Sequence, residues 1–465
     1  MPWFERLTTL DSTFLHLEGR AAHMHVGALA IFEGTPPPIA DVLALVGARL
    51  DRIPRYRQRL AWPPLGRPVW VDDDTFDLEY HVRQTALPAP GDDALLKKLA
   101  GRLLSQQLDR DKPLWELWLV EGLSHGRFAI LSKTHHCMVD GVSGVDIATV
   151  LLDVDADPTP PAPPNKEWIP RPPPTHLDLL GEAMKQQVTE PLQAMRAAFE
   201  PESETRKLFD ELRAGAPAIL GLAQLGSAPR SSLNGRIGPH RRFETVRLEL
   251  SDVKRVRATL GGTVNDVILT VMSIALRARL TDRGDAVAEP LRVMVPVSVR
   301  SAEQRGTFGN QVTAMFCPLP VDEHDPVRAL HRVSEAMKGL KESGQAVGAR
   351  TLSRLGDFAP PTIAAQAARL QAVTRFFNLA ITNVPGPQFP LYMLGRKLAG
   401  CFPAVPLAEG LTLGVALLSY DGGIGIGLLG DHDKAKDLSA LADEIRAALA
   451  ALLRAGAAAA HAQVN

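Results

Sequence analysis

The segment Ser132–Gly144, SKTHHCMVDGVSG, combines two adjacent histidines with an aspartate and a glycine. It lies where a predicted strand ends and a predicted helix begins, and rigid elements on both sides hold such a loop in place. If the strand continues through His135 and His136, their side chains point to opposite faces, so only one can face a given substrate. We expect Asp140 to orient the loop by pairing with a cation, and Gly141 to let the backbone turn tightly or approach a substrate closely.

A histidine at this place is suited to general base catalysis of ester formation. An alcohol is too weak an acid to ionise near neutral pH, so a base must take its proton as the bond to carbon forms. With an unperturbed pKa of about 6.5, imidazole is mostly neutral and can do so. A positioned base is worth roughly 100-fold to 10,000-fold in rate, or about 3 to 5 kcal/mol. The alternative is a structural histidine at a strand end, the commoner case for a lone histidine.

Other chemistry in the same segment has weaker support. Adjacent histidines on a strand diverge, and no third ligand of suitable spacing is nearby, so we predict no metal site. Cys137 has no obvious activating charge, which favours a packing role over that of an acyl-carrying nucleophile. Ser143 lies in GVSG, which is not the GxSxG turn of serine hydrolases.

Composition excludes several classes of protein. The 465 residues are 45% hydrophobic and 22% charged, which is typical of globular proteins and points to two domains. A net charge of -1 offers no attraction to phosphate backbones, so we expect no nucleic acid partner. The cysteines lack the spacing of a disulfide framework, as expected in a reducing compartment; they are Cys137, Cys317 and Cys401.

The sequence also lacks the signals of export and of a membrane span. Charged residues interrupt the apolar residues near the start, at Glu5, Arg6 and Asp11, so no signal peptide is predicted. Nowhere do about 18 apolar residues follow one another, as a spanning helix requires. We therefore expect a cytoplasmic protein whose contact with lipid is peripheral.

Around the histidines, hydrophobic periodicity predicts the elements that must position them. In the first part of the chain we expect strands at Met24–Phe32, Trp115–Val120 and Arg127–Lys133, and helices at Ile39–Leu50, Asp93–Leu108 and Gly141–Leu152.

A proline-dense stretch, DPTPPAPPNKEWIPRPPPT, follows at Asp157–Thr175 and favours an extended connector. After a helical stretch at Leu177–Gly221, a second mixed unit starts near Arg241. Its expected strands are Phe243–Leu250, Leu291–Val297, Val312–Pro318, Asn378–Thr382, Leu411–Ser419 and Gly423–Leu429. Two of its expected helices begin at Ser251 and at Thr263. Three more are expected at Pro326–Leu340, Thr362–Val373 and Leu438–Leu453, and the tail from Ala455 is expected to be frayed. The predicted fold is mixed α/β, with domains at 1–156 and 241–465 joined by a connector at 157–240.

Three glycines near the C-terminal end match the spacing of a dinucleotide-binding loop. Gly425, Gly427 and Gly430 satisfy GxGxxG, but they lie inside an alternating strand pattern and not in a turn that leads from a strand to a helix. We therefore interpret them as strand residues.

The histidine segment, HHCMVDG, matches the HHxxxDG motif of the superfamily that includes chloramphenicol acetyltransferases and peptide-synthetase condensation domains. Nearly the whole chain resembles the bacterial wax ester synthase/diacylglycerol acyltransferase family. Several motifs in the family's order carry the resemblance: LDSTFLHLE and MHVGALAIFE near the start, PLWE at Pro113–Glu116, NDVIL at Asn265–Leu269, VPVSVR at Val295–Arg300, GN at Gly309–Asn310 and TNVPGP at Thr382–Pro387.

The resemblance implies two chloramphenicol-acetyltransferase-like domains, each a mixed sheet flanked by helices, with an active-site tunnel between them. It implies a fatty acyl-CoA and either diacylglycerol or a long-chain alcohol as substrates, with no further cofactor. It makes His136 the base, with His135 and Asp140 shaping the loop. Such apolar substrates lead us to expect a peripheral patch on an inner membrane or lipid droplet, with the helical stretch after the proline connector as candidate.

Further site residues follow from the same resemblance. Asn265 and Asp266 resemble the family's second motif and are expected to line the site, where an amide at a helix start can donate to an oxyanion. The alternative for this motif is helix capping by Thr263 and Asp266. Arg300 is the candidate partner of Asp140, and a strand-end surface charge is the alternative.

Two more residues are candidates for the substrate site. Trp115 is expected in a tunnel wall, although an aromatic residue at a strand start is more often part of the core. Asn383 is expected to reach the site beside a type II turn at Pro385 and Gly386. The alternative is that the motif TNVPGP has a purely structural role.

Two other functions stay open on the sequence. One is a condensation-type acyltransferase that uses a carrier-protein thioester. The other is a catalytically silent lipid-binding or droplet-coating protein. The intact His136 and Asp140 argue against it, because a silent protein has no chemical need for both.

Overall fold

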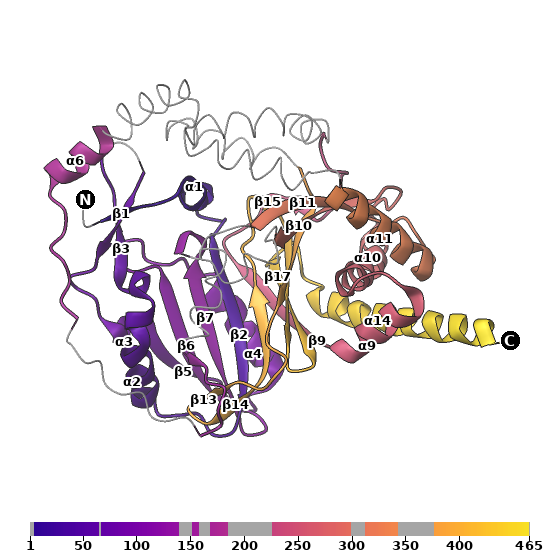
Figure 1. The fold of residues 1–465 in the computed structure, drawn as a ribbon, viewed down its shortest axis with the longest axis horizontal. Helices are drawn as coiled ribbons and strands as arrows, with labels where there is room; N and C mark the ends of the chain where they lie inside the picture. Colours follow the sequence, from indigo (N-terminus) through magenta and orange to yellow (C-terminus); the bar gives the residue numbers. More distant parts are fainter. Residues whose placement is uncertain are drawn as a thin grey trace.

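In a computed structural model of the chain, the structure describes residues 4–64, 67–138, 151–157, 168–184, 226–298, 312–342 and 376–464. They form two six-stranded mixed sheets with helices packed on them, and Figure 1 shows the two sheets next to each other in the middle of the molecule. The predicted mixed α/β class with two sheets is confirmed.

The N-terminal sheet has the strand order β13-β14-β2-β7-β6-β5, in which only β5 and β6 are parallel. Its strands are β2 (His25–Glu33), β5 (Val82–Ala86), β6 (Trp115–Leu123), β7 (Arg127–His135), β13 (Tyr392–Met393) and β14 (Arg396–Ala404). A three-stranded sheet beside it contains β1 (Glu5–Arg6), β3 (Gln58–Ala61) and β4 (Val69–Asp72). The accompanying helices are α1 (Thr9–Leu17), α2 (Ile39–Arg49), α3 (Leu78–His81), α4 (Asp93–Leu104) and α6 (His176–Met184), with short 3-10 turns at Leu50–Arg52, Pro54–Arg57 and His136–Met138 (η3).

The N-terminal sheet is buried on both faces. On one face, Phe32 and Phe128 pack in the same cluster as Leu45 of α2. On the other face, Leu131 packs with residues of α4 and with Phe243 of the C-terminal sheet. Because side chains alternate along a strand, His135 lies on the same face of β7 as Leu131.

The C-terminal sheet has the order β11-β10-β12-β16-β17-β9 and is parallel only between β10, β12 and β16. Its strands are β9 (Arg241–Glu249), β10 (Leu291–Ser298), β11 (Val312–Leu319), β12 (Leu379–Pro385), β16 (Leu413–Tyr420) and β17 (Gly423–Asp431). Its apolar residues pack against α9 (Leu250–Leu260), α10 (Val264–Asp282), α11 (Pro326–Glu342) and α14 (Leu438–Val464). A small ribbon pairs β8 (Asn234–Gly235) with β15 (Gly410–Leu411).

β14 belongs to the N-terminal sheet although it lies in the C-terminal part of the sequence. It pairs with β2 in antiparallel fashion, with Leu398 opposite Phe32 and Ala404 opposite Gly27. The division predicted at residue 241 therefore does not separate the sheets, because residues 392–404 complete the N-terminal one.

The glycines of β17 allow β14 to cross close to the C-terminal sheet. A Cβ atom at Gly425 would lie 2.0 Å from the carbonyl oxygen of Cys401, and one at Gly427 would lie 1.8 Å from that of Pro403. No side chain fits at such distances, so the two backbones pack directly on each other. The interpretation of these glycines as strand residues is confirmed.

The predicted elements agree with the observed ones to within a few residues, with some exceptions. α14 continues to Val464, so the prediction of a frayed tail from Ala455 is wrong. The strand β14 was not predicted. Of the predicted helices, Gly141–Leu152, Thr362–Val373 and most of Leu177–Gly221 lie outside the described residues.

Among the described residues, no single helix is both long enough and apolar enough to cross a bilayer. Within the described ranges, one bent pair, α9 with α10 at 98° to each other, meets the same criterion of length and composition.

Candidate functional site

The two histidines lie where β7 ends and η3 begins. His135 is the last residue of the strand and pairs with His25 of β2. His136 is the first residue of η3, and its backbone N–H donates to the carbonyl of Met24 at 2.8 Å. The motif is therefore fixed by a central strand on one side, as predicted for a loop that carries chemistry.

The two imidazoles have different surroundings. His135 is buried, and its Nδ1 accepts a hydrogen bond from the backbone N–H of Cys137 at 3.1 Å. His136 is partly exposed, and its ring stacks on Phe14 of α1 with 3.8 Å between the centroids. The predicted opposite faces required a strand that continues through both histidines, but β7 ends at His135 and His136 belongs to η3, so this condition is not met. Of the two side chains, that of His136 is the less buried.

The ring of His136 is kept uncharged. Burial lowers the pKa of His136 to about 4, although an interaction with its own main chain opposes this shift. Among the described residues, the buried Nδ1 of His136 has no regular hydrogen-bond partner. A neutral imidazole can accept a proton from a bound hydroxyl through the ring nitrogen that carries no hydrogen.

Three residues that the sequence analysis did not select surround the histidines: Phe14, Glu18 and Arg110. Oε2 of Glu18 lies 3.6 Å from Nε2 of His135 and accepts two hydrogen bonds from Arg110. Burial alone would raise the pKa of Glu18, but its contacts with His135 and Arg110 lower it to about 2. The motif LDSTFLHLE contains Phe14 and Glu18 four residues apart, a spacing that places two side chains on one face of a helix.

Cys137 has the properties of a packing residue. It is buried, and burial raises the pKa of its thiol well above the ordinary value. A thiol that stays protonated is a poor nucleophile.

Trp115 lies in the core of the N-terminal part and not in a described cavity. Its indole is buried, stacks on His81 and donates through Nε1 to the carbonyl of Tyr56 at 2.8 Å. These contacts match the core alternative, and a substrate contact of Trp115 stays a prediction. In the same motif, Glu116 lies 3.1 Å from the fully buried Nζ of Lys133. PLWE thus supplies the counter-charge of a buried lysine on β7.

Asn265 and Asn383, predicted for the site from distant motifs, are in contact. Nδ2 of Asn383 donates to Oδ1 of Asn265 at 3.3 Å. Asp266 is buried and completes a capping box with Thr263, in which each side chain accepts from the other residue's backbone N–H. The capping interpretation of Asp266 is confirmed, and a contact of its carboxylate with substrate stays a prediction.

The turn predicted at TNVPGP differs from the observed backbone. A type II turn needs positive φ at its third residue, but Gly386 is not among the described glycines with positive φ. Instead, its N–H donates to the carbonyl of Ser419 at 2.9 Å, and a Cβ there would lie 2.4 Å from the same oxygen. The glycine is required by this close approach to β16, so the type II prediction is wrong.

Asp140, Gly141 and Arg300 lie outside the described residues, and their roles stay predictions. The described contacts bring His135 and His136 together with α1, and Asn265 together with Asn383. Within the described ranges, no hydrogen bond links these two groups. The same ranges contain no cluster of His, Cys, Asp or Glu that could hold a metal ion.

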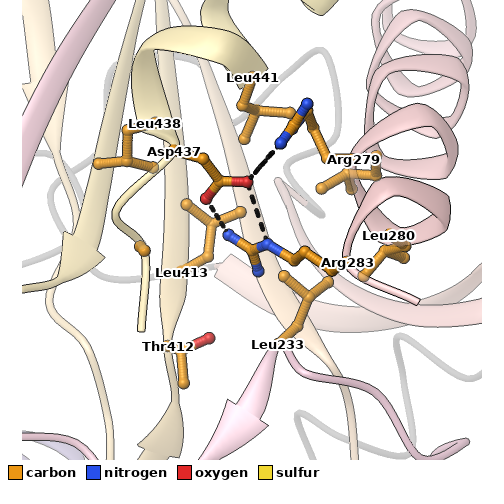
Figure 2. A pocket seen from close by; sticks show the side chains of 11 residues that line it. Leu233, Arg279, Leu280, Arg283, Thr412, Leu413, Asp437, Leu438 and Leu441 are labelled. Carbon is orange, nitrogen blue, oxygen red and sulfur yellow. Dashed lines mark hydrogen bonds and ion pairs between the residues drawn. The ribbon is translucent and has the colours of Figure 1, made fainter. Parts of the chain in front are cut away.

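A small described pocket lies elsewhere, between α10, α14 and the start of β16. Figure 2 shows Asp437 pointing toward Arg279 and Arg283, among leucines such as Leu413 and Leu441. The Asp437 carboxylate bonds both guanidinium groups, which lower its pKa to about 2 although burial opposes them. Its charges are satisfied within the pocket, so we interpret it as a structural ion-pair cluster.

The catalytic-domain model of wax ester synthase/diacylglycerol acyltransferase matches residues 7–268, and the C-terminal-domain model of the same family matches residues 308–453. A probable diacylglycerol O-acyltransferase of Mycobacterium tuberculosis is 34% identical over 465 residues, covering 96% of this chain and 95% of that protein. The wax ester synthase/diacylglycerol acyltransferase of Marinobacter aquaeolei is similar in structure, with a TM-score of 0.72 and 29% identity over 97% of this chain and 100% of that one. The first condensation domain of the CDA synthetase has the same fold, with a TM-score of 0.60 at 16% identity over 97% of both chains.

Proposed function

Since the chain belongs to the wax ester synthase/diacylglycerol acyltransferase family, we propose that it is an acyl-CoA-dependent O-acyltransferase. It transfers a fatty acyl group from acyl-CoA to the hydroxyl of diacylglycerol, of a long-chain alcohol, or of both. The products are a triacylglycerol or wax ester and free CoA. No cofactor takes part besides acyl-CoA as co-substrate, so activity should survive dialysis against a chelator.

His136 acts as the general base of this reaction. Its Nε2 takes the hydroxyl proton while the alcohol oxygen bonds to the thioester carbonyl carbon. The carbonyl oxygen becomes an oxyanion; when it collapses, the C–S bond breaks and the sulfur of CoA receives the proton from the imidazolium. One neutral imidazole therefore serves both halves of the reaction, and no charge remains on the enzyme.

The observation that carries this role is the state of His136 at the end of β7. Its ring is uncharged because burial lowers its pKa to about 4, and Phe14 holds it in place by stacking. A ring held in one position avoids the loss of freedom that a mobile base would suffer in the transition state.

The amide pair supplies the oxyanion donor in this proposal. Because Oδ1 of Asn265 accepts from Asn383, the orientation of the Asn265 amide is fixed with its Nδ2 turned away from that bond. Asn265 lies in the N-terminal turn of α10, where the helix dipole also favours negative charge near its Nδ2. Asn383 thus orients the donor.

One assay separates this function from the two others. Purified protein is mixed with palmitoyl-CoA and either hexadecanol or dioleoylglycerol, and free CoA is measured. CoA release that requires the alcohol supports the proposal. Absence of release with every acyl-CoA tested would contradict it and leave the carrier-dependent condensation enzyme or the silent lipid-binding protein.

For localisation, we propose a cytoplasmic protein that binds an inner membrane or lipid droplet through α6. Leu179 and Ala183 of this helix are buried, whereas Leu177, Leu180 and Met184 are exposed. The exposed residues are spaced by three and four positions, which forms one apolar stripe. Flotation with liposomes tests the idea: the protein should float, and Leu177→Ser with Leu180→Ser should reduce flotation, whereas protein that stays at the bottom would refute it.

A further inference from the structure

A buried carboxylate at the end of α1 contacts the first motif histidine. Glu18 follows the helix directly, its side chain is 3% exposed, and Oε2 lies 3.6 Å from Nε2 of His135. The same oxygen accepts hydrogen bonds from Nε of Arg110 at 2.9 Å and from Nη2 at 2.5 Å. Arg110 also donates to the carbonyl of Leu15 at 3.2 Å. One ion pair therefore connects the end of α1, the loop before β6 and the histidine motif.

The hydrogen bond from Cys137 determines which nitrogen of His135 carries the proton. A backbone N–H can only donate, so Nδ1 of His135 must present its lone pair to Cys137. In the neutral ring the proton then lies on Nε2. In the described part of the chain, the buried Nε2 has no regular hydrogen-bond partner, and the negatively charged Oε2 of Glu18 lies 3.6 Å from it. This charge favours the tautomer that keeps the turn after β7 closed.

The same helix reaches the second histidine. Phe14 lies one helical turn before Glu18 and stacks on His136, with 17° between the ring planes. Arg110 binds both Leu15 and Glu18 and therefore fixes the C-terminal end of α1, next to Phe14. The position of His136 is thus set from two sides, by the turn that His135 closes and by Phe14.

We propose that Glu18, held by Arg110, is a positioning residue for acyl transfer, which acts through His135 and α1 without touching the substrate. This inference rests on the proposed role of His136 as base. A purely structural ion pair would contribute to stability alone, so the two readings differ in their effect on turnover.

The test compares Glu18→Ala and Glu18→Gln with a matched control in the full chain. The control is Glu244→Gln, because Glu244 is also buried and forms an ion pair with Lys97 at 2.5 Å, but lies on β9. We expect Glu18→Ala to lower kcat by about 100-fold through misplacement of the base, with KM for palmitoyl-CoA unchanged. Glu18→Gln keeps an acceptor oxygen and should restore part of the rate. The control should lose melting temperature but not kcat.

Histidine-selective ¹⁵N NMR gives a readout that does not depend on turnover. The wild-type protein should show the proton of His135 on Nε2, and Glu18→Ala should populate both tautomers. Unchanged kcat in a folded Glu18 variant, a loss confined to KM, or a wild-type proton on Nδ1 would each overturn the inference. If Glu18→Ala does not fold, the isosteric Glu18→Gln decides. A wild-type protein that releases no CoA would refute the proposed function, while the tautomer would still decide the positioning of His135.

Discussion

At the scale of single residues, the central feature is a histidine that is buried enough to stay uncharged. Desolvation disfavours imidazolium, and the pKa of His136 falls to about 4. A lower pKa makes a weaker base but keeps the whole population in the active form at neutral pH. The neighbouring thiol of Cys137 is kept protonated by the same burial, which removes a competing nucleophile.

The pH dependence of kcat/KM follows from this burial. Only the neutral ring can take the proton of the alcohol, so activity should be lost as the pH falls through about 4. An exposed histidine would give the same loss at a pH of about 6.5. Initial rates between pH 3.5 and 8, with circular dichroism as a control for unfolding, measure the position of this limb. A limb near the ordinary histidine value would contradict the burial of the base.

The contact between Asn265 and Asn383 gives a second prediction at this scale. Asn265→Ala should lower kcat by roughly 100-fold to 1,000-fold, because it removes the oxyanion donor. Asn383→Ala should have a smaller effect, since Asn383 only orients that donor. The double variant should be no worse than Asn265→Ala alone, as expected for residues that act as a unit. Multiplying effects would show that the two amides act independently.

The sequence indicates those candidate site residues whose signal is local or belongs to a motif. His136 stands in a recognisable segment, and the capping pair Thr263 and Asp266 is encoded within one helical turn. The sequence does not indicate the proposed role of Glu18, because this role depends on contacts with Arg110 and His135, which the fold brings from distant parts of the chain. The alternation of β7 places His135, but it does not extend to His136, which begins the turn η3.

At the scale of elements, the strand β14 carries the largest departure from prediction. Residues 396–404 pair with β2, far away in the sequence, and such pairing leaves no trace in local periodicity. The glycines of β17 were visible as a pattern, but their purpose depends on the crossing backbone of β14. Local patterns thus predicted β17 itself and not what packs on it.

The close packing of β14 on β17 predicts that adding one methyl group to β17 strongly lowers the free energy of unfolding. Gly427→Ala should destabilise the protein by about 1 to 3 kcal/mol or more, because its Cβ would overlap the carbonyl of Pro403. Gly339→Ala in α11 is the control, since a Cβ there meets nothing within 4 Å, and it should be neutral or slightly stabilising. Urea unfolding measures both variants. Equal stability of the two would show that β14 does not pack on β17 as described.

At the scale of the whole molecule, the N-terminal part buries several neutral histidines, which couples stability to pH. Burial lowers the pKa of His81 to about 4, although a hydrogen bond to the carbonyl of Trp115 opposes it. Burial also lowers the pKa of His23 and His25. Between about pH 6.5 and 4, the unfolded chain binds protons that these folded sites refuse. Stability is therefore present at neutral pH and is lost as the pH falls.

At pH 5, the free energy of unfolding should be roughly 2 kcal/mol lower than at pH 7 for each histidine with a pKa near 4. His81→Phe keeps an aromatic ring beside Trp115 and should reduce the difference between the two pH values by about that amount. Urea midpoints at both pH values test this. A wild-type protein equally stable at pH 5 and pH 7 would refute the burial of neutral histidines.

The two-sheet architecture was predictable because each sheet and its helices have clear periodicity. The division of the chain between the sheets was not predictable, since β13 and β14 belong to the N-terminal sheet although they follow most of the C-terminal strands in the sequence. The family relationship covers both parts of the chain and agrees with this arrangement.

The most direct test of the proposed catalytic role is alcohol-dependent CoA release by His136→Ala, measured beside its melting curve. Removing the base should lower kcat by roughly 100-fold to 10,000-fold, while the melting temperature stays close to that of the wild type. A folded His136→Ala protein that releases CoA at the wild-type rate would contradict the role of His136, and an unfolded one would point to a structural histidine.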